Sequence, residues 1–384
     1  MYDVIIIGAG PAGSTCARRC AQQGLRTLLL DKDIFPRPKP CAGAVSEGAF
    51  KLLDFPLPPR LIERECNGVR VHYGRHRISL VKNRRLAILI SRDTFDHYLA
   101  EKAVETGAIF VQDERAADVS ISDRFVEVTT NRTVYESRYV VAADGANSMT
   151  ARLVRPLFSR DEIAAALVCR IPADNAEIDA RIGDSIEMYY GIAPLGYGWV
   201  FPHDGYYAVG IMAAASGKVQ PRRILSDFAA SIGLRAEHCQ GHTIPFGGIR
   251  RSITAGRAML IGDAAGFADP FHGEGIFYAI QSGKLAADAL ARRLNNDDGS
   301  AFEWYEQECD QKIRRNLSVA LNMMRLLEAY PSMFLTIFFA ETDALDRYLD
   351  IAAGTSDYLD FRRWLLARIP WYFMKRMFHA GVSV

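Results

Sequence analysis

The 384-residue chain carries little net charge and has no long uncharged apolar run. Its formal charge of +1 gives no general attraction for nucleic acid, so no nucleic-acid partner is expected. The longest uncharged apolar stretch near the C-terminus, residues 329–340, is twelve residues long and contains Pro331. A helix that crosses a bilayer needs about 20 apolar residues. We therefore expect no transmembrane helix.

The sequence also lacks closely paired cysteines, and its N-terminus lacks the features of a leader. The seven cysteines are Cys16, Cys20, Cys41, Cys66, Cys169, Cys239 and Cys309. None forms a Cys-x-x-Cys pair, which argues against iron–sulfur and zinc sites, and the odd count argues against a disulfide framework. Cys16 and Cys20 share one face of a predicted helix, where small thiols pack well without a metal. We therefore expect no metal site. Because the N-terminus lacks the basic flank and apolar region of a leader, the default expectation for the location is the cytoplasm.

The N-terminal segment has the pattern of a dinucleotide-binding unit. Residues 4–7 form an apolar run typical of a parallel strand buried on both faces. Gly8, Gly10 and Gly13 follow in a G-x-G-x-x-G spacing, which lets a pyrophosphate approach the start of the next helix. Asp31 ends the second predicted strand about 20 residues further on, where an acid suits the hydroxyl pair of a ribose. The same unit supplies Pro11, Ser14 and Lys32 as candidate contacts.

Three later segments indicate which dinucleotide binds. Residues 91–108 predict a helix with Phe95, Leu99 and Ala103 on one face and Gly107 at its end. Residues 139–148 predict a strand that ends in Asp144-Gly145. Residues 258–290 predict a strand, Gly262-Asp263, a glycine-containing loop and a long helix.

The order G-x-G-x-x-G, R-x-x-F-D, D-G and G-D resembles the para-hydroxybenzoate hydroxylase superfamily of FAD enzymes. The resemblance implies that Arg92 reaches the ribityl or pyrophosphate region and that Asp263 binds a ribityl hydroxyl or a water-bridged phosphate. It also implies that the backbone of 273–276 borders the pyrimidine edge and that Ala116 meets adenine. The candidate FAD contacts are Gly8, Gly10, Pro11, Gly13, Ser14, Asp31, Lys32, Cys41, Ala42, Gly43, Arg92, Ala116, Asp144, Gly262, Asp263, Gly273, Gly275 and Ile276.

The middle of the chain has a different pattern. Residues 185–212 alternate and are rich in aromatic residues and glycine, as antiparallel strands are, and residues 68–90 are similar. The predicted fold is therefore α/β, with a Rossmann-like FAD-binding domain, an inserted antiparallel β-sheet substrate domain and a C-terminal helical region. We assign 1–67, 91–160 and 250–299 to the FAD-binding domain, 68–90 and 161–249 to the substrate domain, and 300–384 to the helical region.

Three short pieces, K-P-C-A-G-A-V-S, P-L-G-Y-G-W-V-F-P and F-H-G-E-G-I, resemble the geranylgeranyl reductase family within that superfamily. The resemblance implies an FAD-dependent reductase that saturates C=C bonds of a polyprenyl chain on a lipid, quinone or pigment. Cys41 would lie near the flavin, where the small residues after it let the backbone approach the ring. Tyr197 and Trp199 would wall an elongated apolar pocket, and Phe201-Pro202 would form its floor. The candidate catalytic residues are Cys41, Tyr197 and Trp199.

The sequence departs from the family pattern at two points. Gly210 is followed by Ile211-Met212 where the family often has G-x-G, and Ala42-Gly43 stands where paired glycines are common. Both changes suggest a bulkier pocket end. Reduction of an isolated alkene needs a proton delivered in a dry pocket, and Tyr197, Cys41, His272 or a water that they hold remain open as donors.

Partners and rival functions are also left open by the sequence. A second dinucleotide motif is lacking, so the reductant is either NAD(P)H bound transiently or a protein or small-molecule carrier. Residues 361–381 mix aromatic and basic side chains, which suits either a peripheral contact with anionic lipid or a helix packed on its own protein. The rival functions are a flavin-dependent aromatic monooxygenase or halogenase, and an electron-transfer flavoprotein that reduces quinone.

Overall fold

The computed structural model describes residues 1–215, 219–331 and 342–368. The first sheet has eight strands, with a parallel centre around β1. Along its path the strands are β17 (Thr254–Ala255), β18 (Ala258–Leu260), β11 (Val134–Ala142), β1 (Tyr2–Ile7), β2 (Thr27–Leu30) and β8 (Ile109–Val111), and β10 (Val126–Thr130) and β9 (Ala116–Ile121) extend it from β11. This is the Rossmann-like sheet that the sequence predicts.

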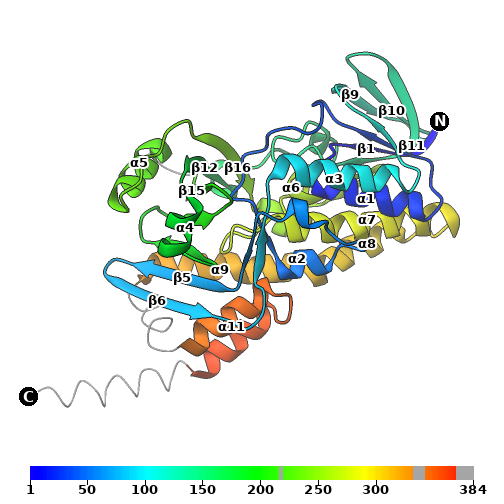
Figure 1. Cartoon of the computed structure of the whole chain (residues 1–384). Helices are drawn as coiled ribbons and strands as arrows, with labels where there is room; N and C mark the ends of the chain where they lie inside the picture. Colours follow the sequence, from blue (N-terminus) through cyan, green and yellow to red (C-terminus); the bar gives the residue numbers. More distant parts are fainter. Residues whose placement is uncertain (216–218, 332–341, 369–384) are drawn as a thin grey trace, which may run out of the picture.

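Strand β1 is buried on both faces, which explains its continuous apolar run. Val4 and Ile6 pack against helices, whereas Ile5 and Ile7 pack on the face that also includes residues of β9 and β10. The helices are α1 (Pro11–Gln22), α3 (Arg92–Val104), α7 (Ile276–Asn295) and the short α6 (Gly262–Ala265). Figure 1 shows α1, α3 and α7 side by side along this sheet. Successive β1 residues point to opposite faces, so an unbroken apolar sequence fits this strand.

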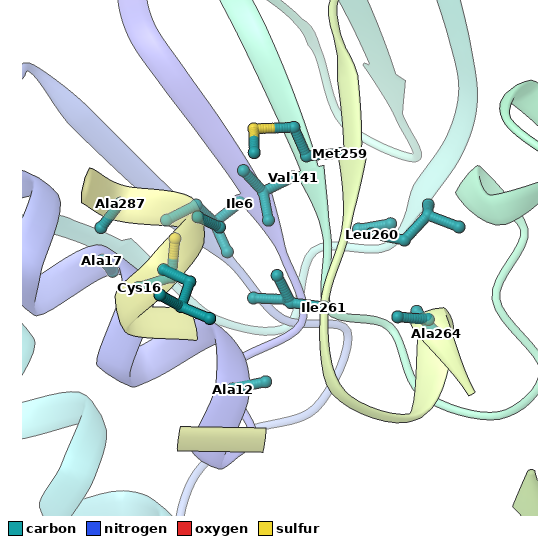
Figure 2. Packing of buried hydrophobic residues seen from close by; sticks show 14 of the residues in the cluster. Ile6, Ala12, Cys16, Ala17, Val141, Met259, Leu260, Ile261, Ala264 and Ala287 are labelled. Atoms are coloured by element: carbon teal, nitrogen blue, oxygen red, sulfur yellow. The ribbon is translucent and has the colours of Figure 1, made fainter. Parts of the chain in front are cut away.

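The core beneath β1 is close-packed, and Cys16 belongs to it. Figure 2 shows Ile6, Val141 and Met259 of the sheet facing Cys16 and Ala17 of α1 and Ala287 of α7. Cys16 and Cys20 are fully buried. The hydrogen bond with Cys16 and burial raise the pKa of the Cys20 thiol well above its ordinary value, so Cys20 is a neutral packing group.

The second sheet has seven strands and lies beside the first (Figure 1). Its order is β16 (Gln240–Pro245), β12 (Ile163–Pro172), β15 (Tyr206–Ala214), β14 (Tyr197–Pro202), β13 (Ser185–Tyr190), β5 (Gly68–Tyr73) and β6 (His76–Val81). All neighbours are antiparallel except β13 and β5. Helices α4 (Asn175–Arg181) and α5 (Pro221–Ser231) cover one face.

A third, small sheet contains part of the segment 68–90, which was predicted to belong to the second sheet. It contains β3 (Ala44–Ser46), β7 (Ala87–Leu89) and β4 (Arg64–Cys66), with α2 (Glu47–Lys51) following β3. Residues 87–89 therefore pair with the strand after the Cys41 loop. The assignment of all of 68–90 to one sheet is wrong at this strand, because alternation shows that a segment is a strand but not which strand it pairs with.

The described C-terminal helices pack into both cores. They are α8 (Ala301–Cys309), a π-helical turn (Asp310–Arg314), α9 (Arg315–Ala329), α11 (Thr342–Ala352) and a final helical stretch, 358–368. Tyr305 and Ile313 join the core of the first sheet, whereas Met323, Leu345 and Phe361 join that of the second. Phe361 is buried, so its side chain packs on its own protein, and residues 369–381 of the predicted lipid contact lie outside the described residues. Within the described ranges, none of the helices is long and apolar enough to cross a membrane.

One cysteine pair corrects the expectation of no disulfide. Cys169 of β12 bonds to Cys239, just before β16, across a Cα–Cα distance of 4.3 Å. The two strands are antiparallel neighbours, with Val168 opposite Gln240, and this register brings the cysteines together. The two cysteines are 70 positions apart in sequence, and no local pattern indicates the pairing.

Candidate active site

A cavity of about 760 Å³ lies between the two large sheets and reaches the small one. We call its two walls the motif side and the apolar side. The motif side is formed by Gly8, Gly10, Pro11, Asp31, Lys32, Arg37, Lys39, Cys41, Ala42, Arg92, Ala116, Asp144, Asp263, Gly273, Glu274, Gly275 and Ile276. The apolar side is formed by Val69, Ala166, Val168, Ile186, Met188, Tyr197, Trp199, Phe201, Met212, Ile244, Tyr348 and Leu349. The volume is within the range of cofactor and ligand pockets.

The glycine-rich turn is shaped by close backbone approaches. Gly8 has φ +103°, and a Cβ there would lie 2.3 Å from the Ala143 carbonyl oxygen. A Cβ on Gly13 would lie 1.9 Å from the Gly8 carbonyl oxygen, so helix and strand pack closely only with glycine. At Gly10 the nearest atom to such a Cβ is 3.9 Å away, which leaves open space beside the start of α1. A pyrophosphate fits that space, and the helix N-terminus favours its charge.

Asp31 holds the turn as well as facing the cavity. Its carboxylate accepts hydrogen bonds from the Ala9 and Asp33 amides at 2.7 and 3.0 Å. Burial raises the pKa of Asp31, although these hydrogen bonds act against the increase. The carboxylate oxygens keep further lone pairs for a ribose hydroxyl.

Two arginines meet at one buried carboxylate on the motif side. Arg92 makes a bidentate pair with Asp96, at 2.7 and 2.8 Å, and Arg37 reaches the same carboxylate at 3.2 Å. Asp96 is fully buried, so it fixes both guanidinium groups at the cavity wall. Arg92 was predicted from the sequence as a cofactor contact, whereas Arg37 was not. A basic residue in "FPRPKP", directly after the second strand, is a signal that could have indicated a contact with phosphate.

Asp263 is the last of three polar side chains that contact one another in the order Lys39, His242 and Asp263. His242 Nε2 lies 3.4 Å from its Oδ2, and Lys39 Nζ lies 3.1 Å from His242 Nδ1. Burial would raise the pKa of Asp263, but His242, Lys39 and Arg92 lower it overall, and burial lowers the pKa of Lys39. Lys39 and His242 were missed, because they are 203 residues apart in sequence.

The remaining predicted contacts divide into two groups. Asp144 lines the cavity; its Oδ2 accepts from the Met149 amide, whereas its buried Oδ1 has no partner among the described residues. Gly13, Ser14, Gly43 and Gly262 do not line the cavity. They support it: Ser14 donates to the Ala9 carbonyl, and the Gly262 amide donates to Ser282.

These features fit FAD. The open space at Gly10, the unpartnered Asp144 oxygen and the basic groups at one wall match the pyrophosphate and hydroxyl groups of a dinucleotide. The loop 273–275 precedes the N-terminus of α7, where a helix dipole stabilises negative charge on a ring edge.

The Cys41 loop is clamped by a histidine that the sequence reading did not single out. His203 is buried, and its Nε2 donates to the Ala42 carbonyl at 2.9 Å, because a carbonyl oxygen can only accept. Its Nδ1 lies 2.5 Å from Glu63 Oε2. A Cβ on Gly43 would lie 2.8 Å from the His203 ring, so glycine is needed there. His203 directly follows the P-L-G-Y-G-W-V-F-P piece, which ends with strand β14, and thus joins that strand to the Cys41 loop.

Strand β14 presents alternate aromatic residues to the cavity. Tyr197, Trp199 and Phe201 line it, whereas Val200 packs on the opposite face of the sheet. The Tyr197 hydroxyl donates to the His272 carbonyl at 2.5 Å, and burial raises its pKa well above the ordinary value. Its proton is therefore engaged with the loop, and a positioning role suits Tyr197 better than proton transfer.

The loop before α7 carries one more polar group that the sequence reading missed. Glu274, the middle residue of G-E-G, lines the cavity and accepts a hydrogen bond from the Ser46 hydroxyl. Burial raises the pKa of Glu274 to about 7, although Ser46 and His272 act against the increase. A carboxyl group that titrates near neutrality can be an acid or a base in catalysis.

Known proteins resemble this chain over most of its length. An FAD binding domain family model matches residues 1–320. The chain is 34% identical to an uncharacterized protein of Methanosarcina barkeri over 77% of this chain and 76% of that one. It is 30% identical to digeranylgeranylglycerophospholipid reductase 2 of Methanothermobacter thermautotrophicus, over 91% and 92% of the two chains.

Solved structures share the fold. A geranylgeranyl bacteriochlorophyll reductase-like protein from Thermoplasma acidophilum superposes with a TM-score of 0.77 at 27% identity, covering 92% and 91% of the two chains. A flavin-dependent brominase superposes with a TM-score of 0.72 at 19% identity, over 95% and 98% of the chains, which shows a common fold only. The predicted cofactor is confirmed as FAD, and the chain belongs to the geranylgeranyl reductase family of FAD-dependent oxidoreductases.

Proposed function

We propose that this protein saturates C=C bonds of a polyprenyl chain carried by a lipid. The observation that carries the proposal is the apolar side of the cavity. Six strands of the second sheet and α11 contribute apolar or aromatic side chains that face the motif side, where FAD would bind. A pocket with long greasy walls and few polar groups suits an extended hydrocarbon rather than a small polar aromatic substrate.

The reaction needs a site without water, in which a hydride donor and a proton donor are held in fixed positions beside the alkene. Bound FAD, once reduced, would supply a hydride to one alkene carbon, and a proton must reach the other. Trp199, whose buried indole nitrogen has no partner among the described residues, and Phe201 would hold the chain and exclude water. Cys41 also lines the cavity, on a loop fixed by His203, and would position the reacting bond. Electrons for the next cycle come from an external two-electron donor, such as NAD(P)H or a redox carrier.

The test is anaerobic incubation of the FAD-loaded protein, reduced with dithionite, with a digeranylgeranyl glycerophospholipid in detergent. Mass spectrometry should find products heavier by a pair of hydrogen atoms for each saturated bond, and protein without reductant should give none. Products that gain oxygen or halogen would support a monooxygenase or halogenase instead. A quinone substrate reduced only in its ring, with the chain intact, would support electron transfer.

A further inference from the structure

Glu274 is an ionisable residue of the cavity wall that has no role in the reaction proposed above. It lies in the loop directly before α7, on the motif side of the cavity and near Tyr197 of the apolar side. One of its carboxyl oxygens, Oε1, accepts from Ser46. Its other oxygen, Oε2, has no hydrogen-bond partner within residues 1–215, 219–331 and 342–368.

The hydrogen bond that Ser46 donates to Oε1 leaves Oε2 as the oxygen available for a proton. Ser46 is the N-cap of α2, and its Oγ accepts from the Ala49 amide at 3.1 Å. With the hydroxyl hydrogen of Ser46 donated to Glu274 Oε1, that oxygen is occupied as an acceptor. A protonated Glu274 therefore carries its acidic hydrogen on Oε2, the oxygen that the protein leaves free.

The surroundings favour the neutral carboxylic acid. Burial is the main cause of the raised pKa, and the nearby Asp269 carboxylate adds to it, whereas Ser46 and His272 oppose it. The titratable groups that face Glu274 are Asp269 and His272 from its own loop, Tyr197 from β14 and Tyr278 from α7. With a pKa of about 7, a large share of Glu274 is protonated at neutral pH.

The other proton donors considered from the sequence are less suited. The Tyr197 hydroxyl donates to the His272 carbonyl. His272 Nδ1 bonds to the Tyr358 hydroxyl, which itself donates to Asp269 at 2.8 Å, so Nδ1 carries the hydrogen. The other ring nitrogen, Nε2, is buried and has no partner among the described residues, but in a neutral ring with its hydrogen on Nδ1 it carries only a lone pair and has no proton to donate. Cys41 is the remaining competitor.

We propose that Glu274 is the general acid of the proposed alkene reduction, and that Ser46 is a positioning residue that directs its proton into the cavity. The proposal rests on the proposed function. As a hydride from reduced FAD forms a C–H bond at one alkene carbon, the Glu274 Oε2–H bond breaks and its proton forms the C–H bond at the other. The alkene is reduced, FAD is oxidised, and the carboxylate regains a proton from water.

The first experiment follows a single turnover of dithionite-reduced enzyme mixed anaerobically with the digeranylgeranyl lipid. Glu274→Gln should slow lipid-dependent flavin oxidation by about 100- to 10,000-fold, while FAD affinity and reduction by dithionite stay unchanged. In the wild type the rate should be highest below pH 7 and fall about tenfold per pH unit above it, because the acid form is required. The slow residual rate of Glu274→Gln should lack this decline.

A matched control is Glu187→Gln. Glu187 is a buried carboxylate of β13 that bonds to Tyr189 and does not line the cavity. Its variant should keep the wild-type rate and pH profile. Ser46→Ala should move the decline to higher pH, because the Ser46 hydroxyl lowers the pKa of Glu274, and Ser46→Thr should restore the wild-type profile. Loss of the α2 cap alone would lower stability without moving the profile.

A second readout needs neither FAD nor lipid. The folded-state pKa of Glu274 is above its ordinary value of 4.5, so the folded protein binds more protons than the unfolded chain between about pH 4.5 and 7. Stability from this group is present below pH 4.5 and lost as the pH rises through 7. The melting temperature of the apoprotein should therefore fall across this window relative to that of Glu274→Gln. Glu187 has a lowered pKa, so its stabilisation is lost as the pH falls instead.

The outcomes separate the two proposals. If the wild type saturates no polyprenyl lipid, the proposed function fails and the role of Glu274 fails with it. If the wild type is active but Glu274→Gln keeps its rate and its decline with pH, Glu274 is not the acid and the function stands. A melting difference that is flat between pH 4.5 and 7 would also overturn the proposal, because Glu274 would then be ionised in the folded protein.

Discussion

The two sides of the cavity are built on different physical principles. On the motif side, glycine backbone and charged groups at the ends of strands create the site, and several positions tolerate no Cβ, such as Gly8 and Gly13. On the apolar side, side chains create the site, and they come from alternate positions of strands that the sheet itself holds in place. Substitutions should therefore act on FAD binding on one side and on lipid turnover or preference on the other.

The Glu274 loop belongs to both sides. Gly273 approaches a buried hydroxyl closely, since a Cβ there would lie 2.2 Å from the Tyr197 oxygen. Tyr197 in turn belongs to the apolar side. The contact between Gly273 and Tyr197 thus joins the two sides of the cavity where the proposed reaction needs both a hydride and a proton. Variants near this contact test whether the two sides act independently.

The largest effect outside Glu274 is expected at Cys41. Cys41→Ala should leave FAD affinity nearly unchanged, because backbone and charged groups hold the cofactor, and should slow lipid reduction by about ten- to a thousandfold through lost positioning. If Glu274 supplies the proton, Cys41→Ser should be as slow as Cys41→Ala. Recovery of the rate in the serine variant would assign proton delivery to Cys41 instead. Cys66→Ala, a buried thiol outside the cavity, is the control, and FAD titration with single-turnover kinetics measures both effects.

Local patterns predicted the elements but not the contacts between distant segments. The apolar run of β1, the glycine turn, the buried Phe95, Leu99 and Ala103 face of α3 and the antiparallel β13–β15 strands are confirmed, because each depends on neighbours in sequence. The Cys169–Cys239 bond and the bond between Ser46 and Glu274 were not predicted. They join residues 70 and 228 positions apart, and only sheet register and helix packing bring such residues together.

The division of the chain into domains and the roles of the site residues stay predictions. Arg37 and Lys39 lie in the proline-rich segment 35–40. They were not predicted as site residues, because basic residues in a loop are usually solvated. Both line the cavity in the structure. Their positions depend on Asp96 and His242, which no local pattern connects to them.

A smaller effect, confined to the motif side, is expected at Asp263. Asp263→Ala should weaken FAD binding by about 1–3 kcal/mol, because it removes a charged partner of a buried polar cofactor and leaves His242 and Lys39 without their carboxylate. FAD-saturated protein should keep its preference among lipids. Asp288→Asn, which breaks a pair with Arg19 outside the cavity, should leave FAD affinity unchanged in the same fluorescence titration. Equal losses in both variants would mean that general destabilisation, and not a contact, weakens binding.

The smallest effect is expected at Met212, where the family often has a glycine. Met212 lines the cavity, and its sulfur lies 3.8 Å from the position of a Cβ on Gly273, so it narrows the apolar side near the Glu274 loop. Met212→Ala should raise kcat/KM for a bulkier chain or headgroup relative to the preferred lipid by about tenfold, the effect of one or two methylene-sized contacts. FAD affinity should not change. Ile211 is fully buried on the opposite face of β15, so Ile211→Ala should cost similar stability and leave the preference as it was. Competition between two lipids in one reaction, read by mass spectrometry, gives the ratio directly. If both variants shift it alike, loosening of the sheet and not the size of residue 212 sets the pocket end.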